Sequence, residues 1–165
     1  MHPSTLLIAP LAPQEFDLAW PIFHAVVSAG DTYAFDPATT LEEARRLWTA
    51  PPARAFLATS GGVTVGTYML RPAQPGLGNH VANAGYMVAP SARRQGVARQ
   101  LCEHSLEVAR QMGFAAMQFN FVVATNQGAI RLWERCGFEI VGRAPRTFRH
   151  GTEGLVDTLV MHRFL

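Results

Sequence analysis

The segment Val88–Ala98 carries the residues whose types and spacing point most directly to chemistry. Arg93, Gly96 and Ala98 form the pattern R-x-x-G-x-A where an amphipathic helix is predicted to begin. The first N–H groups of a helix lack partners within it, and that end of the helix dipole is partly positive, so it attracts anions. Gly96 lets a phosphate approach the backbone closely, and Arg93 and Arg94 add positive charge. The pattern predicts a turn that binds a diphosphate.

Several elements must position this turn. A strand over residues 81–88 leads into it, and a helix from Gly96 to about Met112 follows, with apolar side chains at helical spacing. A strand over 117–123 comes next, and then a segment over 126–138 with the pattern N-x-x-A-x-x-L-W-x-x-x-G-F. The turn alone could be an ordinary Pro-Ser loop with arginines in the first helical turn. The order of the flanking elements favours the binding interpretation.

This order of strand, R-x-x-G-x-A turn, helix, strand and second motif resembles the GNAT superfamily of acetyl-CoA-dependent N-acetyltransferases. The resemblance is good over roughly residues 54 to 165 and loose over the first fifty. It implies acetyl-CoA as cosubstrate and no metal. Together with the alternation of strands and helices, it predicts an α/β fold, with helices on both faces of a mixed, mostly antiparallel central sheet.

The resemblance also assigns residues to the coenzyme. In the family, backbone amides at the end of the strand before the turn pair with pantetheine, which points to Tyr86, Met87 and Val88. The alternative is that these amides serve only the sheet. The complete set of expected coenzyme contacts is Tyr86, Met87, Val88, Arg93, Arg94, Gln95, Gly96, Val97, Ala98, Asn126 and Trp133.

Protonation of the leaving thiolate is where the sequence departs from the family pattern. Many relatives have tyrosine at the position of Trp133, and an indole N–H donates a hydrogen bond but does not release its proton at neutral pH. Trp133 is therefore expected to pack beside the pantetheine arm or in the core. Asn126 is the candidate catalytic residue, because its amide could donate to the thioester sulfur. The alternative is that Thr125 or Asn126 only caps the following helix.

Asn83, Asn120 and Asn126 share a further pattern, because the segments around them resemble the yeast proline-analogue N-acetyltransferases, which act on azetidine-2-carboxylate. The resemblance implies that Asn83 contacts the substrate carboxylate, and that Asn120 and Phe121 offer it backbone amides. The alternative is a pair of asparagines satisfying each other in the core, since an unpaired buried amide costs on the order of 1–3 kcal/mol. A small substrate mouth is expected from Asp31, Thr32, Tyr33 and Phe35.

The attacking amine must lose a proton before it reacts. His80, at the start of its strand, is the histidine expected nearest to the site, although a solvated histidine at the strand end is the more frequent explanation. Ordered water held by Asn83 and nearby carbonyls is the preferred proton route.

The composition limits the class of protein. A length of 165 residues predicts one domain, 1–165, and 48% hydrophobic with 16% charged residues fits a compact fold. A net charge of +2 is too small to indicate nucleic acid, and no apolar run approaches a membrane span. Cys102 and Cys136 fall in predicted helices and are expected to fill the core. The N-terminus lacks a secretory pattern, so we expect a cytoplasmic protein, with a homodimer left open.

The remaining elements are read from turn and periodicity signals. We expect a strand over 4–9, a helix over 13–28 kinked at Pro21, a helix that begins at Thr40 and ends before Pro51, and a hairpin around Gly61-Gly62. Strands over 138–142 and 155–161 are expected to flank an irregular Gly/Pro/Arg-rich connection.

The leading hypothesis is an acetyl-CoA-dependent N-acetyltransferase whose small-molecule amine, an amino acid or proline analogue, attacks the thioester directly. Peptide or protein amines are the second option. A catalytically silent CoA-binding sensor or interaction module is the alternative of a different class. A nucleotide-binding protein is disfavoured, because neither G-x-x-x-x-G-K-[ST] nor G-x-G-x-x-G occurs.

Overall fold

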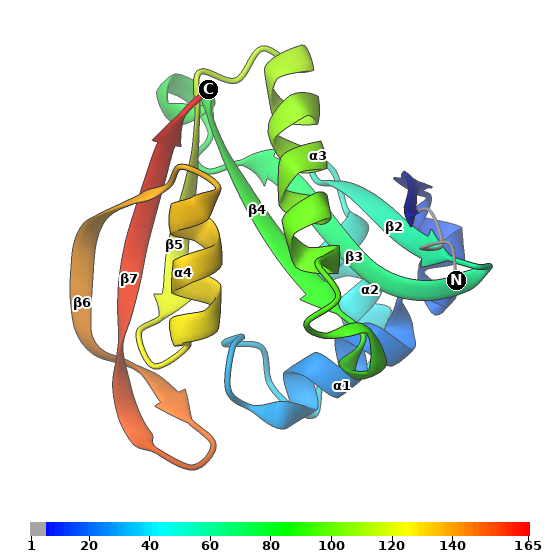
Figure 1. Cartoon of the computed structure of the whole chain (residues 1–165), viewed down its shortest axis with the longest axis horizontal. Coiled ribbons are helices and arrows are strands. Elements are labelled where there is room, and N and C mark those ends of the chain that lie inside the picture. The colour runs from blue at the N-terminus through cyan, green and yellow to red at the C-terminus, as the bar shows by residue number, and fades with distance from the viewer. Residues whose placement is uncertain (1–5) are drawn as a thin grey trace.

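The computed structural model describes residues 6–165, within which seven strands form one sheet in the order β1-β2-β3-β4-β5-β7-β6 (Figure 1). Neighbouring strands are antiparallel except for β4 and β5, which are parallel. The predicted mixed, mostly antiparallel sheet is confirmed. The strands are β1 (Leu6–Leu11), β2 (Arg54–Ser60), β3 (Val63–Pro72), β4 (Val81–Val88), β5 (Ala116–Val123), β6 (Glu139–His150) and β7 (Gly154–Phe164). Residues 4 and 5 of the predicted first strand lie outside the described residues.

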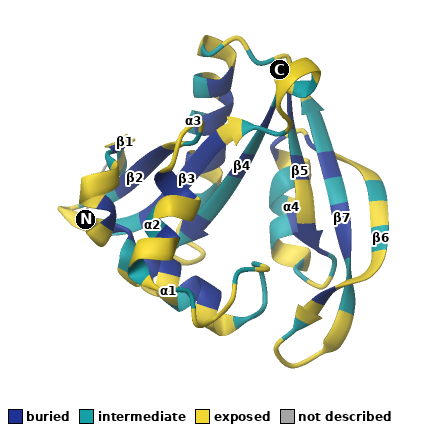
Figure 2. Ribbon diagram, turned by 180° about the vertical axis from the view of Figure 1, so that it is seen from behind, coloured by how far each residue is buried: buried dark blue, intermediate teal, exposed yellow. Residues whose placement is uncertain are grey.

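Helices cover both faces of this sheet. On one face lie α1 (Trp20–Ala29) and α2 (Leu41–Thr49), and on the other lie α3 (Val97–Gln111) and α4 (Gln127–Arg135), as Figures 1 and 2 show from opposite sides. Figure 2 also shows that the buried residues gather where these helices meet the strands. Three short 3₁₀ helices complete the described elements: η1 (Pro13–Leu18), η2 (Gly76–Gly78) and η3 (Pro90–Ala92).

The first helical region differs from the sequence prediction. A 3₁₀ helix, η1, comes first and α1 begins separately at Trp20, so a single kinked helix over 13–28 is wrong. Pro21 lies in the first turn of α1, where its missing N–H would have had no partner within the helix. The proline therefore starts α1 and does not bend it.

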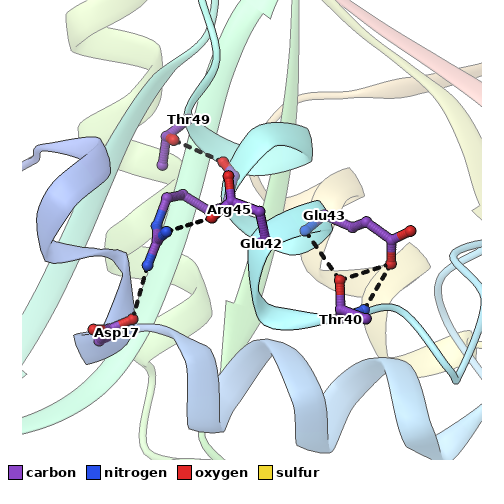
Figure 3. Close-up of polar contacts among 6 residues, drawn as sticks. All are labelled: Asp17, Thr40, Glu42, Glu43, Arg45 and Thr49. Carbon is purple, nitrogen blue, oxygen red and sulfur yellow. Dashed lines mark hydrogen bonds and ion pairs between the residues drawn. The ribbon is translucent and has the colours of Figure 1, made fainter.

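The start of α2 is fixed by polar contacts that Figure 3 shows. Thr40 accepts from Glu43 N, and Glu43 accepts from Thr40 N at 2.8 Å, which forms a capping box. Arg45 pairs with Asp17 of η1 at 3.1 Å and with Glu42. These contacts anchor the far end of the loop between α1 and α2.

The C-terminal hairpin is longer than the sequence predicts. The Gly/Pro/Arg-rich segment belongs to β6, which continues to His150 on the edge of the sheet, so an irregular connection is wrong. An edge strand tolerates proline, and the register shifts between Ala144 and Phe148 absorb the irregular residues. At the hairpin tip, Gly151 N donates to Gly30 O at 2.9 Å. This bond joins the β6–β7 turn to the loop that follows α1.

The sheet opens in its middle. β4 and β5 pair only at Val81 with Ala116 and at Ala82 with Met117, and they diverge beyond that point (Figure 1). Asn83 Nδ2 donates to Gln118 O at 2.9 Å across the start of the divergence. The edges of two central strands are thus left facing each other without a ladder between them.

Candidate active site

A cavity of about 940 Å³ occupies the opening between β4 and β5. One end, called the turn end, consists of Ala92–Arg99, where β4 passes into α3. The other, called the loop end, consists of Asp31–Phe35 after α1 and His150–Glu153 at the β6–β7 turn, which the Gly30–Gly151 bond holds together. Most of the residues predicted from the sequence to contact coenzyme or substrate line this cleft.

At the turn end, the start of α3 is open to an anion. Gly96 caps the helix with a φ of 78°, no side chain bonds to the cap, and the first turn carries no acidic residue. The first helical bond runs from Gln100 N to Gly96 O at 3.2 Å, so the N–H groups of residues 97–99 have no acceptor within the helix. A Cβ built on Gly96 would meet no atom within 4 Å. The space over Gly96 is free for a ligand.

Most of the residues predicted to contact the diphosphate line the cavity at the turn end, but Gln95 does not. Arg93, Arg94, Gly96, Val97 and Ala98 line the cavity, and Arg94 adopts a φ of 63° that non-glycine residues rarely adopt. Gln95 was predicted to contact the coenzyme. Its side chain lies outside the cavity wall, because it turns back to donate to Ser91 O at 3.0 Å.

The three predicted amides of β4 do not face the same way. Tyr33 Oη donates to Tyr86 O at 2.9 Å, which shows that the Tyr86 backbone points away from β3 and into the opening. Backbone groups alternate in direction along an antiparallel pair. The N–H groups of Tyr86 and Val88 therefore face the opening, whereas that of Met87, whose partner is Thr67, faces β3. For Met87 the alternative holds, in which the amide serves the sheet.

Aromatic side chains form the wall on the α3 side. Trp133 lines the cavity and also packs against Tyr86 and Phe119, with ring centroids 5.0 and 5.1 Å apart. The Tyr86 hydroxyl lies 2.6 Å from Ser105 Oγ, and burial raises its pKa well above the usual value. The Trp133 side chain therefore packs against buried aromatic residues and also lines the cavity in which the pantetheine arm is expected.

Asn126 also lines the opening and caps the N-terminus of α4, the helix that carries Trp133. Its Oδ1 accepts from Ala129 N at 3.2 Å, which caps the helix. The capping bond uses the amide oxygen and leaves the Nδ2 donor for another partner. Since Asn126 also lines the cavity, capping and ligand contact are compatible in this residue.

The asparagines do not form a mutual pair in the core. Asn83 bonds to Gln118 O, while Asn120 is exposed and its Oδ1 accepts from Gln118 Nε2 at 2.8 Å. The β5–β7 register shifts between Phe119 and Val122, so residues 120 and 121 form a bulge. Asn83, Asn120 and Phe121 all line the cavity, and bulges of this kind often lie next to functional sites.

The candidate base is corrected by the structure. His80 is exposed at the turn before β4 and lies outside the cavity wall, because its backbone is held there by a bond from Ala115 N to His80 O. The histidine that lines the cavity is His150, whose Nδ1 accepts from the N–H groups of Thr152 and Glu153, both at 3.2 Å. The stretch His150–Gly154 is a hairpin turn signal, which predicts the turn but not its position beside the cavity.

Arg71 and Glu153 are among the further lining residues that were not predicted. Arg71, at the end of β3, stands opposite Asn83 in the β3–β4 register, so both side chains lie on the same face of the sheet. Glu153 comes from the β6–β7 turn. Both positions depend on strand pairings that no local pattern specifies.

Comparison with known proteins identifies the class. The model of the acetyltransferase (GNAT) family matches residues 14–138. The chain therefore belongs to the GNAT family, whose members use acetyl-CoA. It is 39% identical over 97 residues to the N-acetyltransferase aca1 of Schizosaccharomyces pombe, a match that covers 58% of this chain and 46% of aca1. The chain thus spans less than half the length of that relative.

Solved structures agree over nearly the whole chain. A GCN5-related N-acetyltransferase from Kribbella flavida superimposes with a TM-score of 0.91 at 42% identity, covering 97% of this chain and 98% of that one. A ribosomal-protein-alanine N-acetyltransferase from Brucella melitensis gives a TM-score of 0.85 at 23% identity, covering 96% and 99%, and shares the fold. No helix within residues 6–165 is long and apolar enough to cross a membrane.

Proposed function

We propose that this chain transfers the acetyl group of acetyl-CoA to the amine of a compact amino acid, with proline analogues as the favoured class. The observation that carries the proposal is the single cleft between β4 and β5. At one end it has an uncapped helix start with arginines, and at the other it has polar side chains from both sides of the opening. The 39% identity to the N-acetyltransferase aca1 over 97 residues supports acetyl transfer to an amine.

At the turn end, the pyrophosphate would accept from the free N–H groups at the start of α3, with Arg93 and Arg94 adding charge. The pantetheine arm would then run along the unpaired edge of β4. Tyr86 N–H and Val88 N–H face that edge and suit the amide and thioester carbonyls. This binding would point the acetyl group at the widening part of the opening.

For the acetyl acceptor, Arg71 and Asn83 offer a guanidinium and an amide from neighbouring strands on one face. These groups, with the backbone of the bulge at Asn120 and Phe121, suit a carboxylate. Tyr33 and Phe35, stacked with ring centroids 5.5 Å apart, limit the size of the substrate. A compact amino acid therefore fits better than a long flexible amine.

In the transfer itself, the neutral amine would attack the acetyl carbon, the new C–N bond would form and the C–S bond would break. The proton released from the nitrogen would pass through water held by Asn83 and nearby carbonyls to the coenzyme thiolate. Asn126 Nδ2 would donate to the sulfur as negative charge develops there, since no tyrosine stands at the position of Trp133. A preorganised donor acts on developing charge more strongly than on the neutral thioester. The role assigned to Asn126 is therefore electrostatic.

The test is acetyl-CoA turnover, followed as release of free thiol, across amino acids, proline analogues, polyamines, aminoglycosides and peptides with free N-termini. Thiol release with azetidine-2-carboxylate or a related amino acid, together with a mass increase of one acetyl group on the amine, is the expected result. Preference for peptides would contradict the substrate class. Acetyl-CoA binding without thiol release from any amine would indicate a sensor and overturn the proposal.

A further inference from the structure

One carboxylate oxygen in the cavity wall is buried without a hydrogen-bond partner among the described residues. This atom is Oδ1 of Asp31, which lines the loop end. Leaving a buried polar atom unpaired is costly, and the cost is larger when the group is charged. Such an atom in a cavity wall is suited to accept a hydrogen bond from a bound ligand.

The position of Asp31 is held by the backbone on either side. Gly30 ends α1 in a left-handed conformation with a φ of 66°, and its carbonyl accepts from Gly151 of the β6–β7 turn. Two residues further on, Tyr33 is bonded to the Tyr86 carbonyl on β4. Asp31 is thus held between two fixed points, which limits its freedom to turn out to solvent.

The acidic residues of the cavity wall lie at one end, whereas its arginines lie at the turn end and, in the case of Arg71, on β3 opposite Asn83. Arg93, Arg94 and Arg99 line the turn end, where an anionic donor would bind. The acidic residues of the wall, Asp31 and Glu153, both lie at the loop end, on the two segments that the Gly30–Gly151 bond joins. The loop end is therefore suited to a cation.

We infer that Asp31 is a substrate-binding residue whose Oδ1 accepts a hydrogen bond from the ammonium group of the acceptor amine. This inference rests on the proposed function and deepens it, because it selects amines over uncharged nucleophiles. With Arg71 and Asn83 available for a carboxylate, Asp31 completes a set of groups for a zwitterionic amino acid. The ammonium would supply the donor that Oδ1 lacks in the free protein.

The experiment compares the wild type with Asp31→Asn, which keeps the shape and removes the charge. Asp36→Asn is the matched control, because Asp36 is in the same loop but is exposed and bonded to Ala38 N at 2.8 Å. We expect Asp31→Asn to raise KM for azetidine-2-carboxylate by about tenfold to a hundredfold, the range of one charge-assisted hydrogen bond. The Kd for acetyl-CoA should not change in either variant.

Two further measurements separate binding from a structural role. Azetidine-2-carboxylate should protect the wild type against heat better than cyclobutanecarboxylate, which has the same ring size without the amine, and Asp31→Asn should lose that difference. The ligand-free variant should melt no lower than the wild type, because removing an unpaired buried charge does not destabilise the fold. A lower melting temperature, or an unchanged KM, would overturn the inference.

Failure of the proposed function gives a different pattern. If no amine is acetylated by the wild type, the transferase proposal fails, while the heat-protection experiment still decides on Asp31. Equal protection by the two ring acids would then overturn the ammonium contact. A preference for the amine that depends on Asp31 would support the contact in a protein that binds amino acids without acetylating them.

Discussion

The two ends of the cleft are built in different ways. The turn end comes from one continuous segment, Ala92–Arg99, and offers mainly backbone N–H groups at the start of α3. The loop end is assembled from two segments more than a hundred residues apart, Asp31–Phe35 and His150–Glu153, and offers side chains. A backbone site needs a fixed local geometry, whereas a side-chain site changes with each substitution. This difference predicts that the turn end binds what the whole family binds and that the loop end selects the acceptor.

The largest expected effect is at the turn end. Gly96→Glu should abolish acetyl-CoA binding, because the new carboxylate would occupy the empty space over Gly96 and repel the diphosphate. We expect Kd, measured by calorimetry, to rise more than about 100-fold, which corresponds to about 2.7 kcal/mol.

The matched control is Gly62→Glu in the β2–β3 turn. Gly62 has a φ of 79°, close to that of Gly96, and its Cβ would also meet no atom within 4 Å. Both variants carry the same backbone strain and the same added charge, so their melting temperatures should fall equally. Wild-type coenzyme affinity in Gly96→Glu would refute the phosphate-binding role of the turn.

The second-largest effect should be on kcat and concerns Asn126, which lies between the turn end and the loop end of the cleft. Asn126→Ser keeps a capping oxygen but removes the Nδ2 donor, whereas Asn126→Ala removes both. If the amide stabilises the leaving thiolate, both variants should lower kcat by at least about tenfold, the effect of about 1.4 kcal/mol in the transition state. Only Asn126→Ala should also lose about 1 kcal/mol of stability with the cap. An unchanged kcat in Asn126→Ser would limit Asn126 to capping.

The turn end could be predicted from the sequence because its geometry is local. The strand over 81–88, the helix start at Gly96 and the capping position of Asn126 follow from spacing within a dozen residues, and the structure has each of them. The sheet and its flanking helices followed in the same way from the alternation of elements.

The loop end could be predicted only in part. Asp31, Thr32, Tyr33 and Phe35 were expected at the substrate mouth and line the cavity, whereas the other lining residues depend on long-range pairing. Arg71 reaches the cavity through its register with Asn83, and His150 reaches it because β6 continues past an irregular stretch that reads as a loop. His80 was expected near the site because it directly precedes β4 in the sequence. The part of β4 that lines the cavity begins at Asn83, however, and His80 lies outside the cavity wall. Orientation also needed the structure, since the β3–β4 register and the Tyr33–Tyr86 bond reveal which β4 amides face the opening.

A smaller effect should show that amine binding at the loop end can change without a change in coenzyme binding at the turn end. A Cβ on Gly85 would lie 3.0 Å from Tyr33 Oη and 3.4 Å from the Trp48 ring, so Gly85→Ala should push Tyr33 off the Tyr86 carbonyl. Overpacking of this kind costs about 1–3 kcal/mol. Because the displaced Tyr33 would no longer shape the loop end, we expect KM for the amine to rise roughly several-fold. The Kd for acetyl-CoA should not change. Gly142→Ala, whose Cβ would make ordinary contact with Val160 at 3.7 Å, is the control. A matching rise in coenzyme Kd would show that the two ends are not independent.

The smallest effect concerns a group that lies at neither end. His104 of α3 has Nδ1 2.8 Å from Tyr68 Oη, and burial lowers its pKa below the usual value of about 6.5. Because the unfolded chain binds this proton more readily than the folded one, the stability contribution is complete above about pH 6.5. This contribution is lost as the pH falls from about 6.5 through the folded-state pKa.

The test compares the wild type with His104→Gln, whose side chain does not titrate. Between pH 7.5 and 5 the melting temperature of the wild type should fall further than that of the variant. The difference should be only about 1–2 °C, because solvent screens the partly exposed ring. Since His104 lies outside the cavity wall, KM for the amine and Kd for acetyl-CoA should not change with this substitution. A change in only one of the two would show that α3 transmits strain to that end of the cleft.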